Sequence, residues 1–240
     1  MSPETEGDKG SGALPERLLT PSAAQHSVLD VAMVKIKVCG ITNLADAEKA
    51  LEFGADALGF NFYPPSPRSI APEKARAILE ALPERSCNVA LFVNESKEKV
   101  REILAHGLLG GGRQAYGALQ FHGDESEDYC RDWALKVIKA FRLKEKQSLQ
   151  GMEKFPADFF LLDSWSAGYG GSGEAFSWDW LEGLPTERLI LSGGLTLENV
   201  AEAVRRIRPY GVDVCSGVES HPGVKDHGKL KEFIIAAQAA

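Results

Sequence analysis

Residues 37–42 read KVCGIT, and they close an apolar, strand-like run at Cys39. Residues 159–164 read FFLLDS and repeat this arrangement, with the apolar run ending at Asp163. Each segment therefore presents one chemically capable side chain at the exit of a buried strand. In a parallel (β/α)8 barrel such exits meet at one mouth, and that mouth is where chemistry takes place. The two segments predict a barrel of this kind if strands and helices alternate along the chain.

From Met33 onward, strand-like and helix-like segments do alternate, and this pattern predicts a parallel sheet. Strands are expected at 34–39, 56–63, 87–93, 117–122, 136–141, 158–163, 189–192 and 212–215. Helices are expected at 43–53, 72–82, 96–105, 126–133, 144–153, 177–182, 197–207 and 228–239, with a glycine-rich loop at 108–117. A doubly wound open sheet is the alternative, but no GxGxxG follows the first strand. The predicted fold class is therefore α/β, a single (β/α)8 TIM barrel.

The first 32 residues differ in composition from the rest of the chain. They are rich in Ser, Gly, Pro and Glu and lack apolar periodicity, so residues 1–32 are expected to be a disordered N-terminal extension. They lack the apolar core of a secretory signal, and five acidic against two basic residues do not suit a transit peptide. The barrel domain is expected to span residues 33–240, and Met33 is a possible alternative start.

Composition and charge exclude several classes of protein. The 240 residues are 44% hydrophobic and 25% charged, which is ordinary for a globular protein. A net charge of −7 argues against nucleic acid or an acidic membrane as a partner, but not against a small anion in a local pocket. No apolar stretch approaches the ~18 residues of a membrane span. Four cysteines without CxxC spacing suit reduced thiols and a cytoplasmic location. The oligomeric state stays open.

Three glycine clusters follow the last three predicted strands. They are GGSG at 170–173, SGGL at 192–195 and SGV at 216–218. Loops after strands seven and eight form the recurrent phosphate site of these barrels, because glycine lets backbone N–H groups approach an anion closely. Each cluster alone would be explained by a tight turn. Two clusters at the two expected places favour a phosphorylated substrate, bound by Gly193, Gly194, Ser216 and Gly217.

A series of motifs, taken together and in order, resembles the phosphoribosylanthranilate isomerase family of tryptophan biosynthesis. The resemblance runs from Met33 to near the C-terminus. Its motifs are KVCGIT (37–42), GFNFYPPSPRSI (59–70), LFVNES (91–96), LQFHGDES (119–126), LLDS (161–164), GGSG (170–173), FSWDW (176–180), LILSGGL (189–195) and VDVCSGVESHPGVKD (212–226). Single motifs such as GGSG are weak evidence, whereas the set is highly specific.

The resemblance implies an Amadori rearrangement of a phosphorylated aminoaldose to an aminoketose. The reaction needs an acid that protonates the ring oxygen and a base that removes the C2 proton. By motif, Asp163 matches the family's general acid and Cys39 its general base. The resemblance implies no metal and no organic cofactor, because the substrate's own nitrogen is the electron sink. Without it, Cys39 would be interpreted as a core residue and Asp163 as a turn residue.

The resemblance also implies a set of substrate-binding residues. Arg68 matches the arginine that faces the anthranilate carboxylate, and a guanidinium fork suits that group. Gln120 and His122 lie where the family lines its pocket, although His122 is equally compatible with a structural hydrogen bond. Asp213 matches an aspartate that supports or contacts the sugar. The remaining thiols, at Cys87, Cys130 and Cys215, are interpreted as ordinary core or surface residues.

Strand geometry adds one expectation that does not depend on the family. Side chains alternate along a strand, so Lys37 shares the inward face with Cys39, and Asp213 shares one with Cys215. The first and eighth strands are neighbours once a barrel closes. A buried lysine needs a partner, so we expect Lys37 to pair with Asp213 and its ammonium to favour the Cys39 thiolate.

Two other functions remain possible at this stage. One is a related phosphosugar barrel enzyme, such as the histidine-pathway isomerase or a two-substrate homologue. That enzyme is expected to carry an aspartate at the first strand exit, where this chain has Cys39. The other is a non-catalytic binder of phosphorylated ligands, which is expected to have lost Cys39 or Asp163. Both residues are present.

Overall fold

The computed structural model describes residues 33–84, 86–165 and 176–240. The expected disordered extension, residues 1–32, lies outside the described residues. The GGSG cluster at 170–173 lies outside them too. The described residues all belong to the expected barrel domain.

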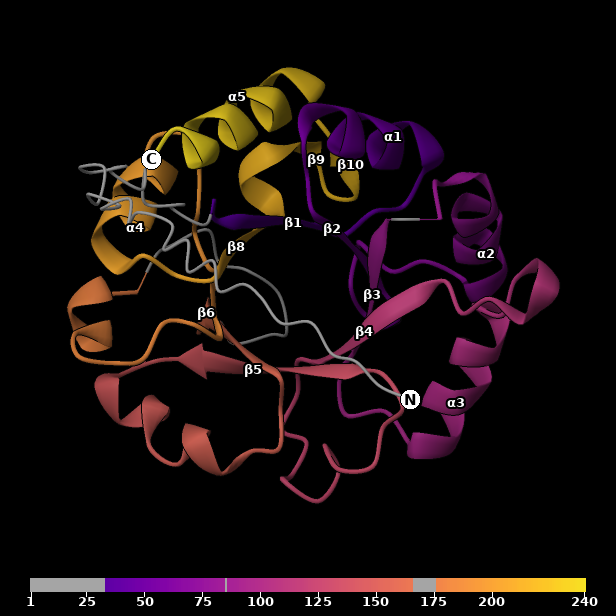
Figure 1. The fold of residues 1–240 in the computed structure, drawn as a ribbon, viewed down its shortest axis with the longest axis horizontal. Coiled ribbons are helices and arrows are strands. Elements are labelled where there is room, and N and C mark those ends of the chain that lie inside the picture. Colours follow the sequence, from indigo (N-terminus) through magenta and orange to yellow (C-terminus); the bar gives the residue numbers. More distant parts are fainter. Residues whose placement is uncertain (1–32, 85, 166–175) are drawn as a thin grey trace, which may run out of the picture. The chain divides into compact units, whose positions relative to one another are not determined.

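Eight parallel strands form a closed barrel in which they follow one another in chain order. Figure 1 looks down this ring of strands. The strands are β1 (Lys35–Cys39), β2 (Ala57–Asn61), β3 (Cys87–Phe92), β4 (Tyr116–Phe121), β5 (Lys136–Leu143), β6 (Phe159–Ser164), β7 (Leu189–Leu191) and β8 (Gly211–Val214). The ring closes where β8 pairs with β1. The predicted (β/α)8 barrel is confirmed, with strand ends within a few residues of those expected.

The described residues form five α-helices, which lie outside the ring in Figure 1. They are α1 (Leu44–Phe53), α2 (Pro72–Ala81), α3 (Lys97–His106), α4 (Val200–Ile207) and α5 (His227–Gln238). Polar side chains start three of them: Asn43, Ser96 and Asp226 each accept a backbone N–H from the first turn of the helix that follows. None of the helices in the described part of the chain is long and apolar enough to cross a membrane.

Three expected helices are absent from the described residues, and a fourth is shorter than expected. Residues 126–133 form turns instead, and Asp132 has a left-handed φ of 64°, a conformation that a helix interior does not contain. The segment 144–153 holds only the 3-10 turns η2 (Lys146–Leu149) and η3 (Met152–Lys154), separated at Gly151, whose φ is 80°. Residues 177–182 contain a single 3-10 turn, η4 (Trp178–Leu181), and α4 begins at Val200 rather than at residue 197.

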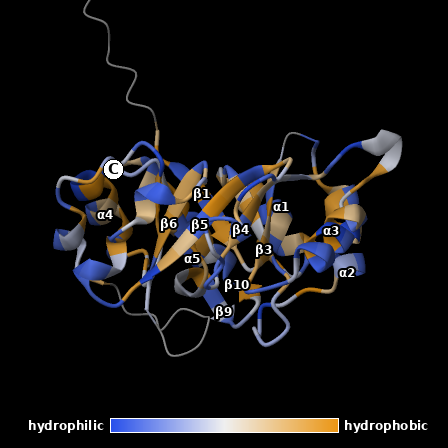
Figure 2. Cartoon of the chain, turned by 90° about the horizontal axis from the view of Figure 1, so that it is seen from below, coloured by the Kyte–Doolittle hydropathy of each residue, from blue (hydrophilic) through white to orange (hydrophobic). Residues whose placement is uncertain are grey.

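A small hairpin after β8 was not expected from the sequence. A 3-10 turn, η5 (Ser216–Val218), leads into β9 (Glu219–His221), which pairs antiparallel with β10 (Val224–Lys225). Pro222 and Gly223 make the turn between them, and Gly223 has a positive φ of 85° that glycine adopts without strain. Figure 2 shows this hairpin at one end of the barrel.

Apolar side chains fill both sides of the strands. The larger cluster lies between the strands and the helices, and Figure 2 shows the strands largely in the hydrophobic colour. A smaller cluster fills the barrel interior and comprises Val89, Ala118, Ile138, Ala140, Leu161 and Ile190. Such layers of inward side chains make the barrel a packed core rather than a pore. Polar side chains that point inward lie between this smaller apolar cluster and the carboxyl ends of the strands.

Candidate active site

A pocket opens at the carboxyl ends of the strands, where the sequence predicted the site. Cys39, the last residue of β1, and Asp163, near the end of β6, both line it. The other predicted residues that line it are Arg68, His122, Asp213, Gly193, Gly194, Ser216 and Gly217. Gln120 is fully buried beneath His122 and is not among the lining residues. One mouth therefore brings together the two candidate catalytic groups and the candidate anion-binding groups.

A buried ion pair supports the side of the mouth formed by β1 and β8. Lys37 lies opposite Asp213 in the parallel ladder, and its Nζ is 2.7 Å from Asp213 Oδ1. Both side chains are about 95% buried, since each exposes only 5% of its surface. Burial alone would lower the pKa of Lys37, but Asp213 and Cys39 outweigh it and hold that pKa above its usual range. The predicted pairing of Lys37 with Asp213 is confirmed.

Cys39 sits above this pair in an environment that favours its thiolate. The neighbouring Cys215 thiol and the ammonium of Lys37 lower the pKa of Cys39 to about 6, against the opposing effects of burial and of Asp213. This environment favours the thiolate form of Cys39. The expected effect of Lys37 on Cys39 is confirmed, but the first contributor is Cys215.

On the opposite side of the mouth, a chain of hydrogen bonds leads from β4 to Asp163. Gln120 Nε2 lies 2.8 Å from His122 Nδ1, and His122 Nε2 lies 3.1 Å from Asp163 Oδ2. An amide nitrogen only donates, so Nδ1 of His122 accepts and Nε2 carries the proton that it donates to Asp163. Asp163 Oδ1 accepts a second bond from the Ser164 N–H at 2.8 Å. These contacts fix the orientation of the carboxyl group.

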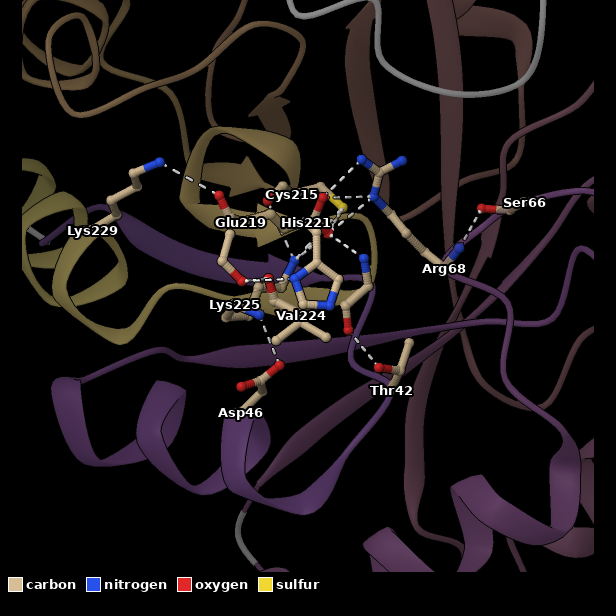
Figure 3. A network of polar contacts seen from close by, with 12 residues as sticks. Thr42, Asp46, Ser66, Arg68, Cys215, Glu219, His221, Val224, Lys225 and Lys229 are labelled. Atoms are coloured by element: carbon tan, nitrogen blue, oxygen red, sulfur yellow. Dashed lines mark hydrogen bonds and ion pairs between the residues drawn. The ribbon is translucent and has the colours of Figure 1, made fainter.

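Arg68 is held at the rim of the pocket by the hairpin that follows β8. Its Nε and Nη2 donate to the two carboxylate oxygens of Glu219 at 3.0 and 2.8 Å, a bidentate arrangement. Glu219 also accepts a bond of 3.1 Å from Lys225 Nζ. Figure 3 shows Arg68 reaching across to this buried pair. The guanidinium is therefore placed by β9 and β10 as well as by its own loop.

The two glycine turns after β7 and β8 come together on the same wall. Gly193 and Gly194 have positive φ angles of 80° and 65°, which place both in the left-handed region. A Cβ atom on Gly193 would clash with the backbone nitrogen of Ser164, and one on Gly217 would clash with the carbonyl oxygen of Leu195. The close packing of these two turns therefore requires glycine. The same glycines are the ones that the sequence suggested for an anion site.

Three residues that sequence reasoning passed over belong to this site. Cys215 was interpreted as an ordinary thiol, but it lines the pocket together with Cys39, which corrects that interpretation. Glu219 and Lys225 were quoted only as letters of a motif. The alternation that put Asp213 and Cys215 on one face of a strand was the signal that Cys215 faces Cys39.

The described residues contain no group of three or more His, Cys, Asp or Glu side chains arranged to hold a metal ion. The arrangement is suited to proton transfer between two separated groups and to binding of anions. One group is a thiolate beside an ammonium, and the other is a carboxyl group oriented by an imidazole.

Comparison with known proteins gives consistent results. The model of the family described as N-(5'phosphoribosyl)anthranilate (PRA) isomerase matches residues 36–236. A relative of that name from Trichlorobacter lovleyi is 47% identical over 211 residues, which are 87% of this chain and 100% of the relative. One from Thermotoga neapolitana is 46% identical and covers 86% of this chain and 99% of its own length.

Solved structures with the same description also match. The phosphoribosyl anthranilate isomerase of Thermotoga maritima is 41% identical, with a TM-score of 0.78, over 87% of this chain and 100% of that one. A second structure, a complex with reduced 1-(o-carboxyphenylamino)-1-deoxyribulose 5-phosphate, is 40% identical with a TM-score of 0.74, over the same shares. The compound in that complex carries a carboxylate and a phosphate, the two anionic groups for which this mouth has candidate sites.

Proposed function

The chain belongs to the N-(5′-phosphoribosyl)anthranilate isomerase family, and on that premise we propose how its residues perform the reaction. It is an isomerase that converts N-(5′-phosphoribosyl)anthranilate to 1-(o-carboxyphenylamino)-1-deoxyribulose 5-phosphate. In the proposal Asp163 is the general acid and Cys39 the general base. The observation that carries it is that both face one pocket, with Cys39 beside Lys37 and Asp163 bonded to His122.

The first step is opening of the furanose ring. Asp163 gives its proton to the ring oxygen, the C1–O bond breaks, and the lone pair of the anthranilate nitrogen forms a C1=N iminium. His122 keeps the carboxyl group of Asp163 oriented through its 3.1 Å hydrogen bond. Positioned proton transfer of this kind contributes roughly 10²–10⁴-fold to a rate.

The second step is removal of the C2 proton. The Cys39 thiolate takes that proton, and the electrons of the C2–H bond move toward the iminium to give an enolamine. Loss of the proton from the C2 hydroxyl and gain of one at C1 complete the aminoketose. A base acts best when its pKa lies near the working pH, and the pKa of about 6 at Cys39 meets that condition.

The two anionic groups of the substrate are assigned to two parts of the rim. Arg68 is proposed to bind the anthranilate carboxylate, since a guanidinium has five N–H donors and Glu219 engages only Nε and Nη2. Backbone N–H groups around Gly193, Gly194, Ser216 and Gly217 are proposed to bind the phosphate. Asp213, which bonds Lys37 and accepts from Ser192 Oγ at 3.2 Å, is proposed to support the sugar.

Gln120 and His122 are proposed to have different roles, since Gln120 supports His122 and His122 contacts the substrate. Gln120 is proposed to act through His122, because it is buried and its amide donates to the imidazole. His122 lines the pocket and is proposed to contact the substrate. We include a cytoplasmic location in the proposal, because all four cysteines are unpaired, as expected in a reducing compartment.

A spectroscopic assay with freshly prepared phosphoribosylanthranilate tests this assignment. The parent chain is expected to isomerise it without added metal or cofactor. Arg68→Lys is expected to raise KM more than it lowers kcat, because an ammonium lacks the planar fork. Arg113→Lys, in the loop before β4 and outside the residues that line the pocket, is the matched control and should leave both constants unchanged. An effect of Arg68→Lys on kcat alone would contradict its assignment to the carboxylate.

A further inference from the structure

The hairpin of β9 and β10 brings two cations to one carboxylate. Glu219, on β9, accepts from Arg68 Nε at 3.0 Å and from Arg68 Nη2 at 2.8 Å, and its Oε1 also accepts from Lys225 Nζ at 3.1 Å. The side chains of Glu219 and Lys225 expose only 4% and 0% of their surface. Figure 3 shows Arg68, Glu219 and Lys225 within one network of polar contacts. One cation neutralises one carboxylate, so pairing with Glu219 does not account for both cations.

The other contacts of Lys225 do not neutralise its charge. Its Nζ donates to the carbonyl oxygen of Cys215 at 3.3 Å and lies 3.8 Å from the Cys215 sulfur. The carbonyl oxygen is neutral, and the neighbouring Cys39 and burial hold the pKa of the Cys215 thiol well above its usual value, so the thiol is neutral too. Asp46 Oδ2 accepts from the backbone N–H of Lys225 at 2.9 Å, not from its ammonium. Among the described residues, Glu219 is the acidic side chain that the ammonium contacts.

Glu219 occupies one edge of the Arg68 guanidinium and leaves the other edge open. Nε and Nη2 form one of the two edges on which a guanidinium binds a carboxylate bidentately, and Glu219 takes that edge. The other edge consists of Nη1 and the second N–H of Nη2, and a substrate carboxylate can bind there. Arg68 lines the pocket, whereas Lys225 is not among the lining residues. Lys225 can therefore influence a bound carboxylate only through Arg68.

The sum of the charges on this wall shows what Lys225 adds. The three linked side chains of the hairpin network, two cations and one carboxylate, together carry one positive charge. The thiolate of Cys39, whose charge acts on Arg68, lies above the ion pair of Lys37 with Asp213, and these three groups together carry one negative charge. The two sets of groups balance. Without Lys225 they would carry one net negative charge, which opposes the binding of an anion.

We propose that Lys225 is a positioning residue for the substrate carboxylate, because by compensating the charge of Glu219 it leaves the positive charge of Arg68 available to that group. The proposal rests on the proposed role of Arg68. Glu219 sets the direction of the guanidinium, and Lys225 sets how strongly that guanidinium attracts an anion. A ligand with a carboxylate on its aromatic ring gains affinity from Lys225, and the same ligand without that carboxylate does not.

The test compares two ligands that differ only in this carboxylate. One is reduced 1-(o-carboxyphenylamino)-1-deoxyribulose 5-phosphate, and the other is the same compound made from aniline in place of anthranilate. Both carry the phosphate, so the effect of a substitution on phosphate binding cancels in the ratio of their dissociation constants. In full-length Lys225→Met and Lys225→Gln variants, the preference for the carboxylate is expected to fall about tenfold, the order expected for the loss of one buried charge near a bound anion. Glutamine keeps an N–H donor for Glu219 but not the charge, so it should lose as much as methionine.

Lys229→Met is the matched control. Lys229 Nζ lies 3.5 Å from the backbone oxygen of Glu219, but the residue is exposed and does not contact the carboxylate. The substitution removes the same charge as Lys225→Met. It should change the preference by less than about twofold, because solvent and salt screen an exposed charge.

Arg68→Lys separates this proposal from the one on which it rests. A lost preference in Arg68→Lys with an unchanged preference in both Lys225 variants overturns the role of Lys225 and leaves Arg68 as the carboxylate site. An unchanged preference in Arg68→Lys overturns both. Parent preference in Lys225→Gln but not in Lys225→Met would show that the hydrogen bond to Glu219 matters rather than the charge, and it also overturns the proposal. Circular dichroism and the affinity for the aniline compound check folding, and Lys225→Gln, which keeps a donor, carries the test if the methionine variant is unfolded.

Discussion

The two walls of the mouth differ in how they hold their reactive group. On the wall made by β1 and β8, Cys39 lies among buried charges, with Lys37 and Asp213 paired at 2.7 Å beneath it. On the wall made by β4 and β6, the side-chain partner of Asp163 is His122, which is itself bonded to the amide of Gln120. One wall stabilises an anion through a cation, and the other orients a carboxyl group through an imidazole.

This difference is consistent with the proposed roles of Cys39 as base and Asp163 as acid. A nearby cation favours the ionised form of an acid, which a base requires and a proton donor must avoid. Lys37 is held in place by its ion pair with Asp213. In that position its ammonium interacts electrostatically with Cys39. The comparison predicts that substitutions in the two walls change turnover, stability and pH dependence in different ways.

The largest effect is expected from removing either reactive group. Cys39→Ser and Asp163→Asn should each lower kcat by roughly two or more orders of magnitude, the range for loss of a positioned proton transfer. Binding of a product analogue should persist, because the candidate carboxylate and phosphate contacts lie elsewhere. Steady-state kinetics and a binding titration measure the two quantities. Near-normal turnover in either variant would remove that residue from its role.

The next effect is on stability and is specific to the β1–β8 wall. Lys37→Met leaves Asp213 buried without its partner, and removing one member of a buried pair costs about 3–5 kcal/mol of unfolding free energy. Lys35→Met is the matched control on the same strand. Its pair with Asp56 is 2.9 Å long but the lysine side chain is 52% exposed, so about 0–1 kcal/mol is expected. Urea unfolding followed by circular dichroism compares them, and equal losses would contradict the distinction.

A smaller effect follows from lowering the pH of the assay. Cys39, as the proposed base, must be deprotonated to act, and its pKa is about 6. The active fraction therefore falls as pH drops through that value, and kcat/KM should decline about tenfold for each further pH unit. Lys37→Met removes a cation that lowers this pKa, so its acidic limb should lie at higher pH. A parent profile without an acidic limb near pH 6 would argue against a thiolate base.

Much of both walls follows from the sequence, because strand exits in a parallel barrel converge and side chains alternate. The Lys37–Asp213 pair needed only these two rules, whereas the interpretation of Cys39 and Asp163 as reactive groups also needed the resemblance to the family. The helices expected at 126–133, 144–153 and 177–182 were wrong, and positive φ angles at Asp132 and Gly151 interrupt the first two of these segments. The pairing of Arg68 with Glu219 was also out of reach, since it joins residues 151 positions apart through an unexpected hairpin.

The smallest effect is expected from removing residues 1–32, which tests whether both walls are complete without them. The residues of both walls, from Lys37 to Cys215, lie within 33–240, and the family model matches 36–236. The first 32 residues lack the apolar periodicity that would offset the entropy of ordering them, and their net charge of −3 does not help to hold an anion. A chain of residues 33–240 should therefore match the full chain in melting temperature and in steady-state kinetics. The run LPERLL at 14–19 is where this prediction is most exposed, since it has the apolar residues for one helical turn. A melting temperature lower by several degrees, or a several-fold change in turnover, would mean that the first 32 residues contribute to the folded enzyme.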